Sequence, residues 1–207
     1  MTIKINLILL LALILTPLGA SAVRFNLYYL SNQATYETSG TKANPSSIGG
    51  YGLSAEFGGL GPHTGFELGY QQTRREIKSS TNTHTLTYTE IPFLLKYHPT
   101  SFLDLGAGVY SGQAGSTVSS TDPNVTTLES IGITNPDFGS VFSVGLNFTV
   151  KKINLFFEGR YTTGLYNLSS NTAIVAKFDQ MQMLLGVCFG SCEKSGGGSS
   201  GGGGVKK

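Results

Sequence analysis

Bulky residues alternate with polar or small ones on both sides of a short break in residues 90–110, EIPFLLKYHPTSFLDLGAGVY. A period of two is typical of a β-strand, because successive side chains of a strand point to opposite sides. In the first run Ile91 and Phe93 share the face opposite Lys96. The break itself, HPTS, contains a proline and two hydroxyl residues, which favour a turn. The segment is therefore predicted to be a β-hairpin with one apolar face.

Similar alternation recurs along the chain and predicts eight strands. They are residues 23–31, 49–58, 65–73, 85–97, 102–112, 138–150, 153–165 and 178–189. None of these segments has the 3.6-residue period of an amphipathic helix. Strands of about ten residues have the length of a tilted bilayer crossing. An even number of strands also returns both ends of a barrel to the same side.

The connections between the predicted strands are alternately long and short. The long ones are residues 32–48, 74–84, 113–137 and 166–177, and the short ones are residues 59–64, 98–101 and 151–152. Outer-membrane barrels combine long external loops with brief periplasmic turns, whereas a water-soluble barrel is under no such constraint. The fold class predicted is therefore all-β, an eight-stranded antiparallel up-and-down transmembrane β-barrel.

The first residues have the composition of an export signal. Lys4 precedes an apolar run that ends at residue 15, a break at Thr16-Pro17 follows, and small residues precede position 23. The run is shorter than the ~20 residues of a membrane-spanning helix, so we expect a signal peptide over residues 1–22 that is cleaved after Ala22. The barrel would then occupy residues 23–192, and the Gly- and Ser-rich residues 193–207 would form a flexible tail.

Charged residues are few and nearly balanced. The chain has 14 Lys and Arg against 12 Asp and Glu, and charged residues make up 13% of it. This balance argues against a nucleic-acid partner, and the local cluster of Arg74, Arg75 and Lys78 is diluted by Glu76 and interpreted as solvated loop. A weakly charged surface suits a wall that faces lipid. We therefore expect a location in the bacterial outer membrane, with its lipid as a partner.

The polar face of the predicted strands carries charges of both signs. They are Arg24, Glu56, Glu67, Glu90, Lys96, Asp104, Glu158 and Arg160. Isolated charges inside a narrow barrel are costly, so we expect a paired network with the three basic residues as the cationic partners. An eight-stranded barrel is just wide enough for side chains to fill it. This width favours a self-neutralising plug over an ion path or a substrate-binding lumen.

The remaining reactive residues do not indicate a catalytic or metal site. Cys188 and Cys192 are close in sequence, and in an oxidising compartment such a pair is expected to form a disulfide, with free thiols as the alternative. Their spacing is not the usual C-x2-C of zinc sites, and His63, His84 and His98 are distant in sequence. The histidines also fall at opposite predicted ends of the barrel. We expect no metal, no cofactor and no enzymatic activity.

Several segments share features with a known family. They are YTEIPFLLKYHP, FLDLGAGVYSG, NPDFGSVFSVGLNF, FFEGRYTTGLYN and QMLLGVCFG. Together they resemble the outer-membrane β-barrel domain of the PorT type, over most of the mature chain. The resemblance implies a small eight-stranded outer-membrane barrel and no common enzymatic activity. The chain departs from the pattern at its end, because residues continue beyond Phe189, where such a barrel usually finishes on an aromatic residue.

These observations predict a structural or interaction role. The long loops, above all residues 113–137, would contact an external surface or an extracellular or envelope protein, and the barrel would be a monomer. One alternative is a passive channel for small solutes through the lumen. Another is a soluble ligand-binding barrel with its apolar face inward, because the same alternation serves either orientation.

Overall fold

The computed structural model describes residues 23–38, 41–42, 46–61, 63–78, 83–122, 127–128, 133, 136–169 and 176–190. The strands are β1 (Val23–Thr38), β2 (Thr41–Lys42), β3 (Ser46–Gly61), β4 (Thr64–Lys78), β5 (Thr83–Tyr97), β6 (Leu103–Ser120), β7 (Asp137–Val150), β8 (Ile153–Gly164) and β9 (Ala176–Gly190). No helix within the described residues is long and apolar enough to cross a membrane. The expected signal peptide and glycine-rich tail lie outside these residues and stay predictions.

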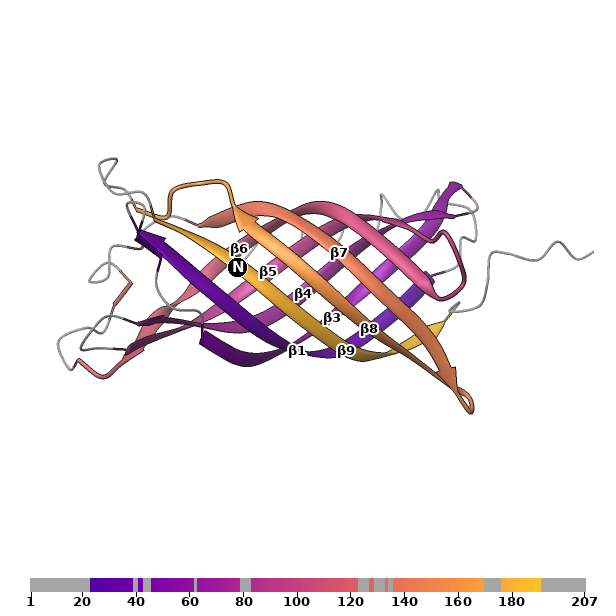
Figure 1. Ribbon diagram of the computed structural model, residues 1–207, viewed down its shortest axis with the longest axis horizontal. Helices are drawn as coiled ribbons and strands as arrows, with labels where there is room; N and C mark the ends of the chain where they lie inside the picture. Colours follow the sequence, from indigo (N-terminus) through magenta and orange to yellow (C-terminus); the bar gives the residue numbers. More distant parts are fainter. Residues whose placement is uncertain are drawn as a thin grey trace, which may run out of the picture.

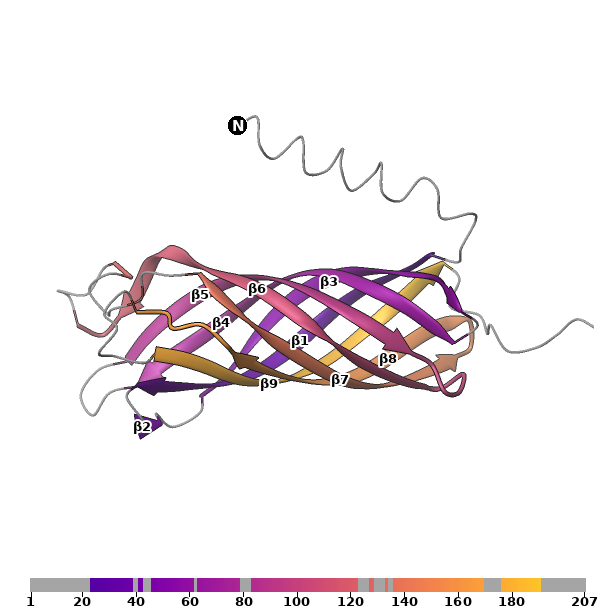
Figure 2. The same ribbon diagram turned by 90° about the horizontal axis from the view of Figure 1, so that it is seen from above.

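The eight long strands close into a barrel. Each pairs antiparallel with its neighbour in the chain, and β1 pairs with β9 from Arg24↔Gly190 to Thr38↔Ala176. The two-residue strand β2 pairs with the end of β1. Figures 1 and 2 show the strands wrapping at a common tilt around one long axis. The predicted eight-stranded antiparallel barrel is therefore confirmed.

The two faces of the barrel wall differ in character. Along β5, Phe93 is 47% exposed and Leu95 is 54% exposed, whereas Leu94 and Lys96 are fully buried. The large apolar residues exposed on the outward face include Phe25, Leu27, Val144, Leu146, Phe157, Met183 and Leu185. An apolar exterior around a charged interior suits a barrel that faces lipid. It is the reverse of what the water-soluble alternative requires.

Three of the four connections that were expected to be long are longer than the short turns, but the β4–β5 connection shrinks to residues 79–82 and is shorter than the β5–β6 connection, residues 98–102. The reason is that several strands continue further toward the long-loop end than predicted. β1 runs to Thr38 instead of residue 31, and β6 runs to Ser120 instead of residue 112. β4 runs to Lys78, through residues that were interpreted as loop. The extensions of β1 and β6 are rich in Ser and Thr, and that of β4, RREIK, is mostly charged. Their outward side chains lie beyond the apolar band. Alternation of apolar residues therefore no longer marks them as strands.

The extended part of the wall divides into two sheets. Pairing between β3 and β4 ends at Tyr51↔Gln72, and pairing between β6 and β7 ends at Gly112↔Asp137. Beyond these positions, within the described residues, β1 lies between β9 and β3, whereas β5 lies between β4 and β6. We call these the β9–β1–β3 sheet and the β4–β5–β6 sheet. Both extend toward the left end of Figure 1.

The opposite end of the barrel is closed by short turns. The β7–β8 turn consists of Lys151 and Lys152, with Lys151 at a positive φ of 60°. The backbone N–H of His98, between β5 and β6, donates to the carbonyl of His63, between β3 and β4, at 2.8 Å. This bond ties two neighbouring turns together at the end where β1 begins and β9 ends.

Candidate functional site

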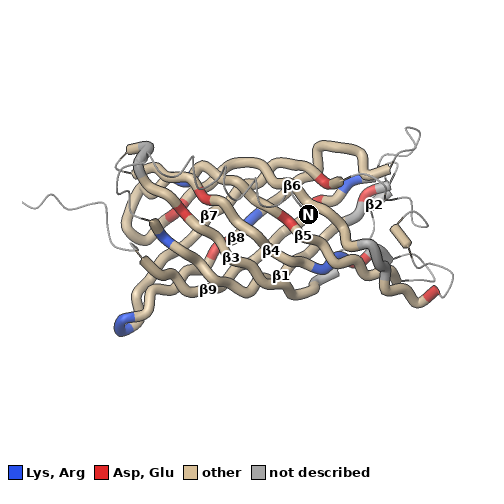
Figure 3. Tube along the Cα trace, turned by 180° about the vertical axis from the view of Figure 1, so that it is seen from behind, with Lys and Arg blue, Asp and Glu red and all other residues tan. Residues whose placement is uncertain are grey.

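Charged side chains occupy the barrel interior at successive levels along its axis. Figure 3 shows Lys and Arg positions interspersed with Asp and Glu positions along the strands. We name the levels by their position. The turn layer contains Arg24, Glu56, His98 and Asp104; the middle layer contains Glu67, Lys96, Glu158 and Arg160; the loop layer contains Arg75, Glu90 and Asp137.

The turn layer lies where β1 enters the barrel. Arg24 Nη1 is 3.4 Å from Asp104 Oδ2 and 3.8 Å from Glu56 Oε2. Asn147 on β7 completes the contact, because its Nδ2 donates to Asp104 Oδ2 at 2.6 Å and its Oδ1 accepts from Arg24 Nη2 at 2.5 Å. Residues from four strands are therefore tied together near the short-turn end.

His98 joins the turn layer from the β5–β6 turn. Its Nδ1 is 2.7 Å from Asp104 Oδ1 and its Nε2 is 2.6 Å from Glu56 Oε1. These hydrogen bonds, first to Asp104 and then to Glu56, raise the pKa of His98 to about 9. The imidazole is therefore a cation at neutral pH. The sequence indicated a turn here but gave no sign that the ring reaches both Asp104 of its own hairpin and Glu56 of another.

The middle layer is a square of two cations and two carboxylates. Lys96 Nζ lies 2.6 Å from Glu158 Oε2 and 3.2 Å from Glu67 Oε2. Arg160 donates from Nη2 to Glu67 Oε1 at 2.6 Å and from Nε to Glu158. All four side chains are at most 4% exposed. Each buried charge contacts two of opposite sign, which offsets the cost of removing it from water.

The loop layer surrounds Glu90. Its carboxylate accepts from Arg75 Nη2 at 2.5 Å and from Gln71 Nε2 at 2.6 Å. Gln182 Nε2 on β9 donates to the second oxygen, Oε2, at 3.1 Å. Arg75 Nη1 also donates to Asp137 Oδ2 at 2.6 Å. One fully buried guanidinium thus connects carboxylates on β5 and β7.

Arg75 corrects the interpretation of the basic cluster as solvated loop. Its side chain is fully buried, and its guanidinium carbon lies 3.7 Å from the ring centroid of Tyr88 and 4.6 Å from that of Phe178. Arg74, by contrast, is exposed. The period of two could have found this difference, because Arg75 shares its strand face with Glu67 and Gln71.

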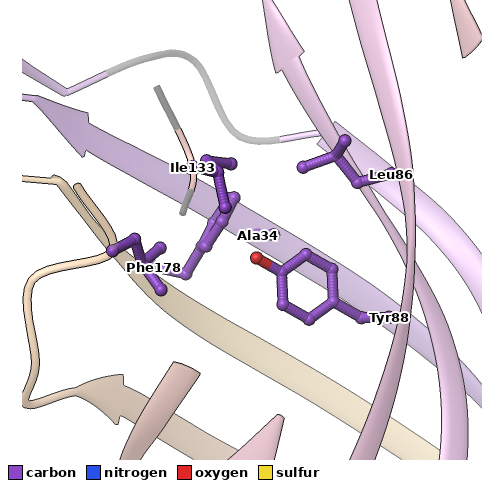
Figure 4. Packing of buried hydrophobic residues seen from close by; sticks show 6 residues of the cluster. Ala34, Leu86, Tyr88, Ile133 and Phe178 are labelled. Carbon is purple, nitrogen blue, oxygen red and sulfur yellow. The ribbon is translucent and has the colours of Figure 1, made fainter. Parts of the chain in front are cut away.

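An apolar cluster closes the barrel above the loop layer. Its buried members are Ala34, Leu86, Tyr88, Ile133, Leu168 and Phe178, with Ala114 and Leu128 packed against them. Figure 4 shows Ile133 and Phe178 on one side of the cluster, with Leu86 and Tyr88 on the other. Ile133 and Leu168 come from the long β6–β7 and β8–β9 connections. The long loops therefore contribute side chains to the mouth of the barrel, and we call this group the apolar cap.

A cavity of about 530 Å³ lies on the wall at the long-loop end. Its lining residues are Ile48 on β3, Arg74 and Glu76 on β4, Thr85 and Thr87 on β5, and Ser119 on β6. It borders the position where β3 and β4 stop pairing. The cavity therefore offers a cation, an anion and three hydroxyls on the projecting part of the barrel.

The histidines and cysteines do not converge on one centre. His84 lies on β5 rather than in the predicted loop, with Nδ1 2.8 Å from Ser120 Oγ, whereas His63 and His98 are at the opposite end. Among the described residues, no group of three or more His, Cys, Asp or Glu could hold a metal ion. Cys188 is disulfide-bonded. Cys192 lies outside the described residues, so the Cys188–Cys192 pairing stays a prediction.

Comparisons with solved structures support the fold. The chain is similar to Ail, the attachment invasion locus protein of Yersinia pestis, solved in complex with the heparin analogue sucrose octasulfate, at 14% identity and a TM-score of 0.50, covering 81% of this chain and 99% of that one. Neisserial surface protein A matches at 14% identity and a TM-score of 0.49, covering 80% and 97%. The outer membrane protease OmpT from Escherichia coli matches at 11% identity and a TM-score of 0.34, covering 83% and 97%.

Sequence comparison identifies the family. A search of curated protein sequences finds no match. Residues 19–170, however, match the family model described as outer membrane protein beta-barrel domain. This match covers most of the chain, and the strands close into a barrel whose exposed wall is apolar. The protein therefore belongs to the outer membrane protein beta-barrel domain family, the small barrels of the bacterial outer membrane.

Proposed function

We propose that this protein is a closed, non-enzymatic barrel that binds an external partner through its long-loop end. The observation that carries the proposal is the filled interior. Ion pairs occupy three levels of the lumen, and the apolar cap lies above them. A barrel filled in this way has little room for substrate or solute, so the accessible surface at the long-loop end is where a ligand would meet it.

The projecting sheets support the same proposal. On β4 the outward apolar residues end at Tyr70, and Gln72, Arg74 and Glu76 follow on that face. From Tyr70 to Lys78 the strand rises roughly 20 Å along the tilted barrel axis at ~3.3 Å per residue. The β4–β5–β6 sheet would therefore stand clear of the lipid and present a polar surface. Ail, which has this fold and is described as an attachment protein, is consistent with such a role by analogy.

Epitope tags test the surface role. A tag inserted among residues 123–126, between β6 and β7, is expected to bind antibody on intact cells, whereas a tag at Lys151 and Lys152 is expected to bind only after permeabilisation. The two tagged variants control for each other, because poor expression would weaken both signals and leaky membranes would expose both tags. If antibody on intact cells bound the tag at Lys151 and Lys152 but not the tag at 123–126, the barrel would have the opposite orientation. The long-loop end could then not bind an external partner.

Planar-bilayer recording separates this proposal from the channel alternative. Purified barrel is expected to give no stable unitary conductance, because the three charged layers and the apolar cap fill the lumen. A steady single-channel current would favour passive transport of small solutes instead. An open porin reconstituted in the same bilayer serves as a check that the recording can detect a conducting barrel.

Two further proposals concern the signal peptide and the place of the protein within its family. We propose cleavage after Ala22. N-terminal sequencing of protein extracted from outer membranes tests this, with Val23 as the expected first residue.

We also propose that the protein is of the PorT type within its family, supported by IPFLLKY in β5 and by Asp137-Phe138-Gly139 at the start of β7. A tree of related barrels that places this chain outside the PorT branch would contradict that assignment.

A further inference from the structure

We propose that the tip of the β7–β8 hairpin binds anionic phospholipid headgroups of the leaflet at the short-turn end. The tip consists of Val150, Lys151, Lys152 and Ile153. Its ligand is a lipid whose headgroup phosphate carries a net negative charge, such as phosphatidylglycerol. This inference goes beyond the proposed function, because it concerns the end of the barrel opposite the long loops.

The tip carries two neighbouring cations. Lys151 and Lys152 are both exposed, and none of the ion pairs among the described residues involves either ammonium group. Inside the barrel, by contrast, Lys96 and Arg75 each contact two carboxylates. In Figure 3 the tip is the blue end that projects at the lower left. The charge of the tip is therefore available to an external anion.

The backbone of Lys151 has a conformation that suits a different residue. Its φ of 60° is the only positive φ of a non-glycine residue in the described part of the chain. Val150 pairs with Ile153, so Lys151 and Lys152 form a two-residue hairpin loop. A positive φ at the first position of such a loop favours glycine or asparagine. A lysine there costs stability that either of those residues would avoid.

Glycine occupies the other described positions at which this end of the barrel has a positive φ. Gly61, before the β3–β4 turn, has a φ of 151°, and Gly190, at the end of β9, has a φ of 90°. At Lys151 the chain instead has a long cationic side chain. An unfavourable backbone conformation at an exposed turn points to a function of the side chain, because folding alone would favour its replacement.

Apolar side chains continue to the end of this hairpin. Val150 is 50% exposed and Ile153 is 58% exposed, and Phe148 precedes them on the outward face. At the long-loop end, by contrast, the outward face of β4 becomes polar after Tyr70. A tip that projected freely into water would leave the apolar residues on both sides of its turn hydrated, which is unfavourable. The arrangement favours a tip that stays in contact with lipid.

Exposed aromatic residues mark the edge of the hydrocarbon beside the hairpin. Tyr97 and Phe102 flank the β5–β6 turn, and such rings gather at membrane interfaces. The N–H of Asn147 on β7 donates to the carbonyl of Phe102 at 2.8 Å, so the two residues lie at the same level. The last three residues of β7 then advance roughly 8 Å along the tilted axis. Because a headgroup layer is ~5–7 Å thick, the lysine pair lies at its outer side.

The chemistry of the pair selects the headgroup. A lysine side chain is long and flexible, so its ammonium group can turn back toward a phosphate from the outer side of the layer. In phosphatidylcholine the charge of the phosphate is offset by the choline of the same headgroup, whereas in phosphatidylglycerol it is not. Each lysine near an anionic membrane surface corresponds to about a fivefold gain in affinity. The pair therefore favours phosphatidylglycerol.

NMR spectroscopy of the barrel in lipid nanodiscs tests the inference. Phosphatidylglycerol is titrated into phosphatidylcholine nanodiscs, and the backbone amide signals of residues 150–153 are followed. We expect shifts that saturate, with a preference for phosphatidylglycerol of at least about tenfold that weakens at high salt. Unchanged signals, or shifts that grow without saturation, would overturn the inference.

Two additions to the same nanodiscs identify the ligand and the depth of the tip. Glycerol phosphate in solution is expected to leave the amide signals of the tip unchanged, and shifts equal to those with the lipid would reject a lipid ligand. A paramagnetic label on the lipid headgroup is expected to broaden the signals of Val150 and Ile153 more than a soluble paramagnetic complex does. The opposite order would place the tip in water and contradict the proposal.

Two substitutions at one position separate charge from backbone. Lys151→Gly removes a cation and suits the positive φ, so we expect the lipid preference to fall about fivefold while the amide of Ile153 exchanges no faster than in the unaltered protein. Lys151→Arg retains the cation and should keep the preference within about twofold. Full preference in Lys151→Gly, or an equal loss in both variants, would show that the charge of the tip does not select the lipid.

Discussion

Backbone pairing differs between the two ends of this barrel. In the lipid-facing part each long strand is paired on both sides, and the wall is closed by β1 and β9. At the long-loop end the β3–β4 and β6–β7 ladders stop, and two separate sheets remain within the described residues. Hydrocarbon offers no partner for a free N–H or C=O, whereas water does. Closure of the wall is therefore compulsory within the lipid and optional at the long-loop end.

The largest expected effect comes from the closed part. Lys96→Met removes one cation from the middle layer and leaves Glu67 and Glu158 to share Arg160. We expect a loss of about 3–5 kcal/mol in the free energy of unfolding, measured by urea titration in phospholipid vesicles. Lys152→Met, in the exposed β7–β8 turn, is the control and should change it by less than about 0.5 kcal/mol. Equal stability of the two variants would show that the layer does not hold the barrel closed.

Two neighbouring residues, Arg74 and Arg75, test the boundary between the closed wall and the projecting sheets. Arg75→Leu removes the buried cation that contacts Glu90 and Asp137, and we expect a loss of about 2–4 kcal/mol in the same titration. Arg74→Leu alters an exposed position and should cost less than about 0.5 kcal/mol. A cost at Arg74 as large as that at Arg75 would contradict the placement of these adjacent side chains on opposite sides of the wall.

The apolar cap is expected to act locally. Leu168→Ala should cost about 2 kcal/mol of packing, which corresponds to about thirtyfold faster amide exchange at Leu86 and Phe178. Exchange at Leu94, in the closed part, should stay unchanged. Leu165→Ala, at a residue that is 52% exposed, is the matched control. Faster exchange along the entire barrel would mean that the two parts unfold as one unit.

The smallest expected effect is a pH dependence at the turn layer. The pKa of His98 is about 9 in the folded protein, against an ordinary value of 6.5. Its contribution is therefore full below pH 6.5 and is lost as the pH rises through 9. We expect stability to fall by roughly 1–2 kcal/mol across this window, after discounting for partial exposure. His98→Gln should flatten the curve, and an unchanged slope in that variant would assign the titration to another group.

The sequence predicted the closed part well because lipid imposes a simple pattern. The outward row of Phe93 and Leu95 must be apolar over the whole width of the bilayer, so the period of two is visible there. The projecting residues of β4 and β6 are under no such constraint, because their outward side chains face water and can be polar. The sequence pattern therefore predicts loop at these positions, where the structure has strand.

The candidate site was predictable to differing degrees. Arg75 follows the same alternation as Glu67 and could have been assigned to the interior by extending the period past residue 73. The contacts of Asp137 with Arg75 and of His98 with Glu56 could not, because they form only when strands of different hairpins come together. Ile133 and Leu168 are each one of several apolar residues in their connections, and no local pattern separates a cap residue from an ordinary loop residue.

The middle layer has a consequence for how the barrel is assembled. Glu67 lies on β4 and Lys96 on β5, whereas Glu158 and Arg160 lie on β8, so Lys96 and Glu158 are 62 residues apart and Glu67 and Arg160 are 93 apart. A half-inserted sheet would hold these charges in the bilayer without their partners, which is a costly intermediate. Insertion and closure of the wall should therefore proceed together, with the last strands joining before the first ones are exposed to the membrane interior.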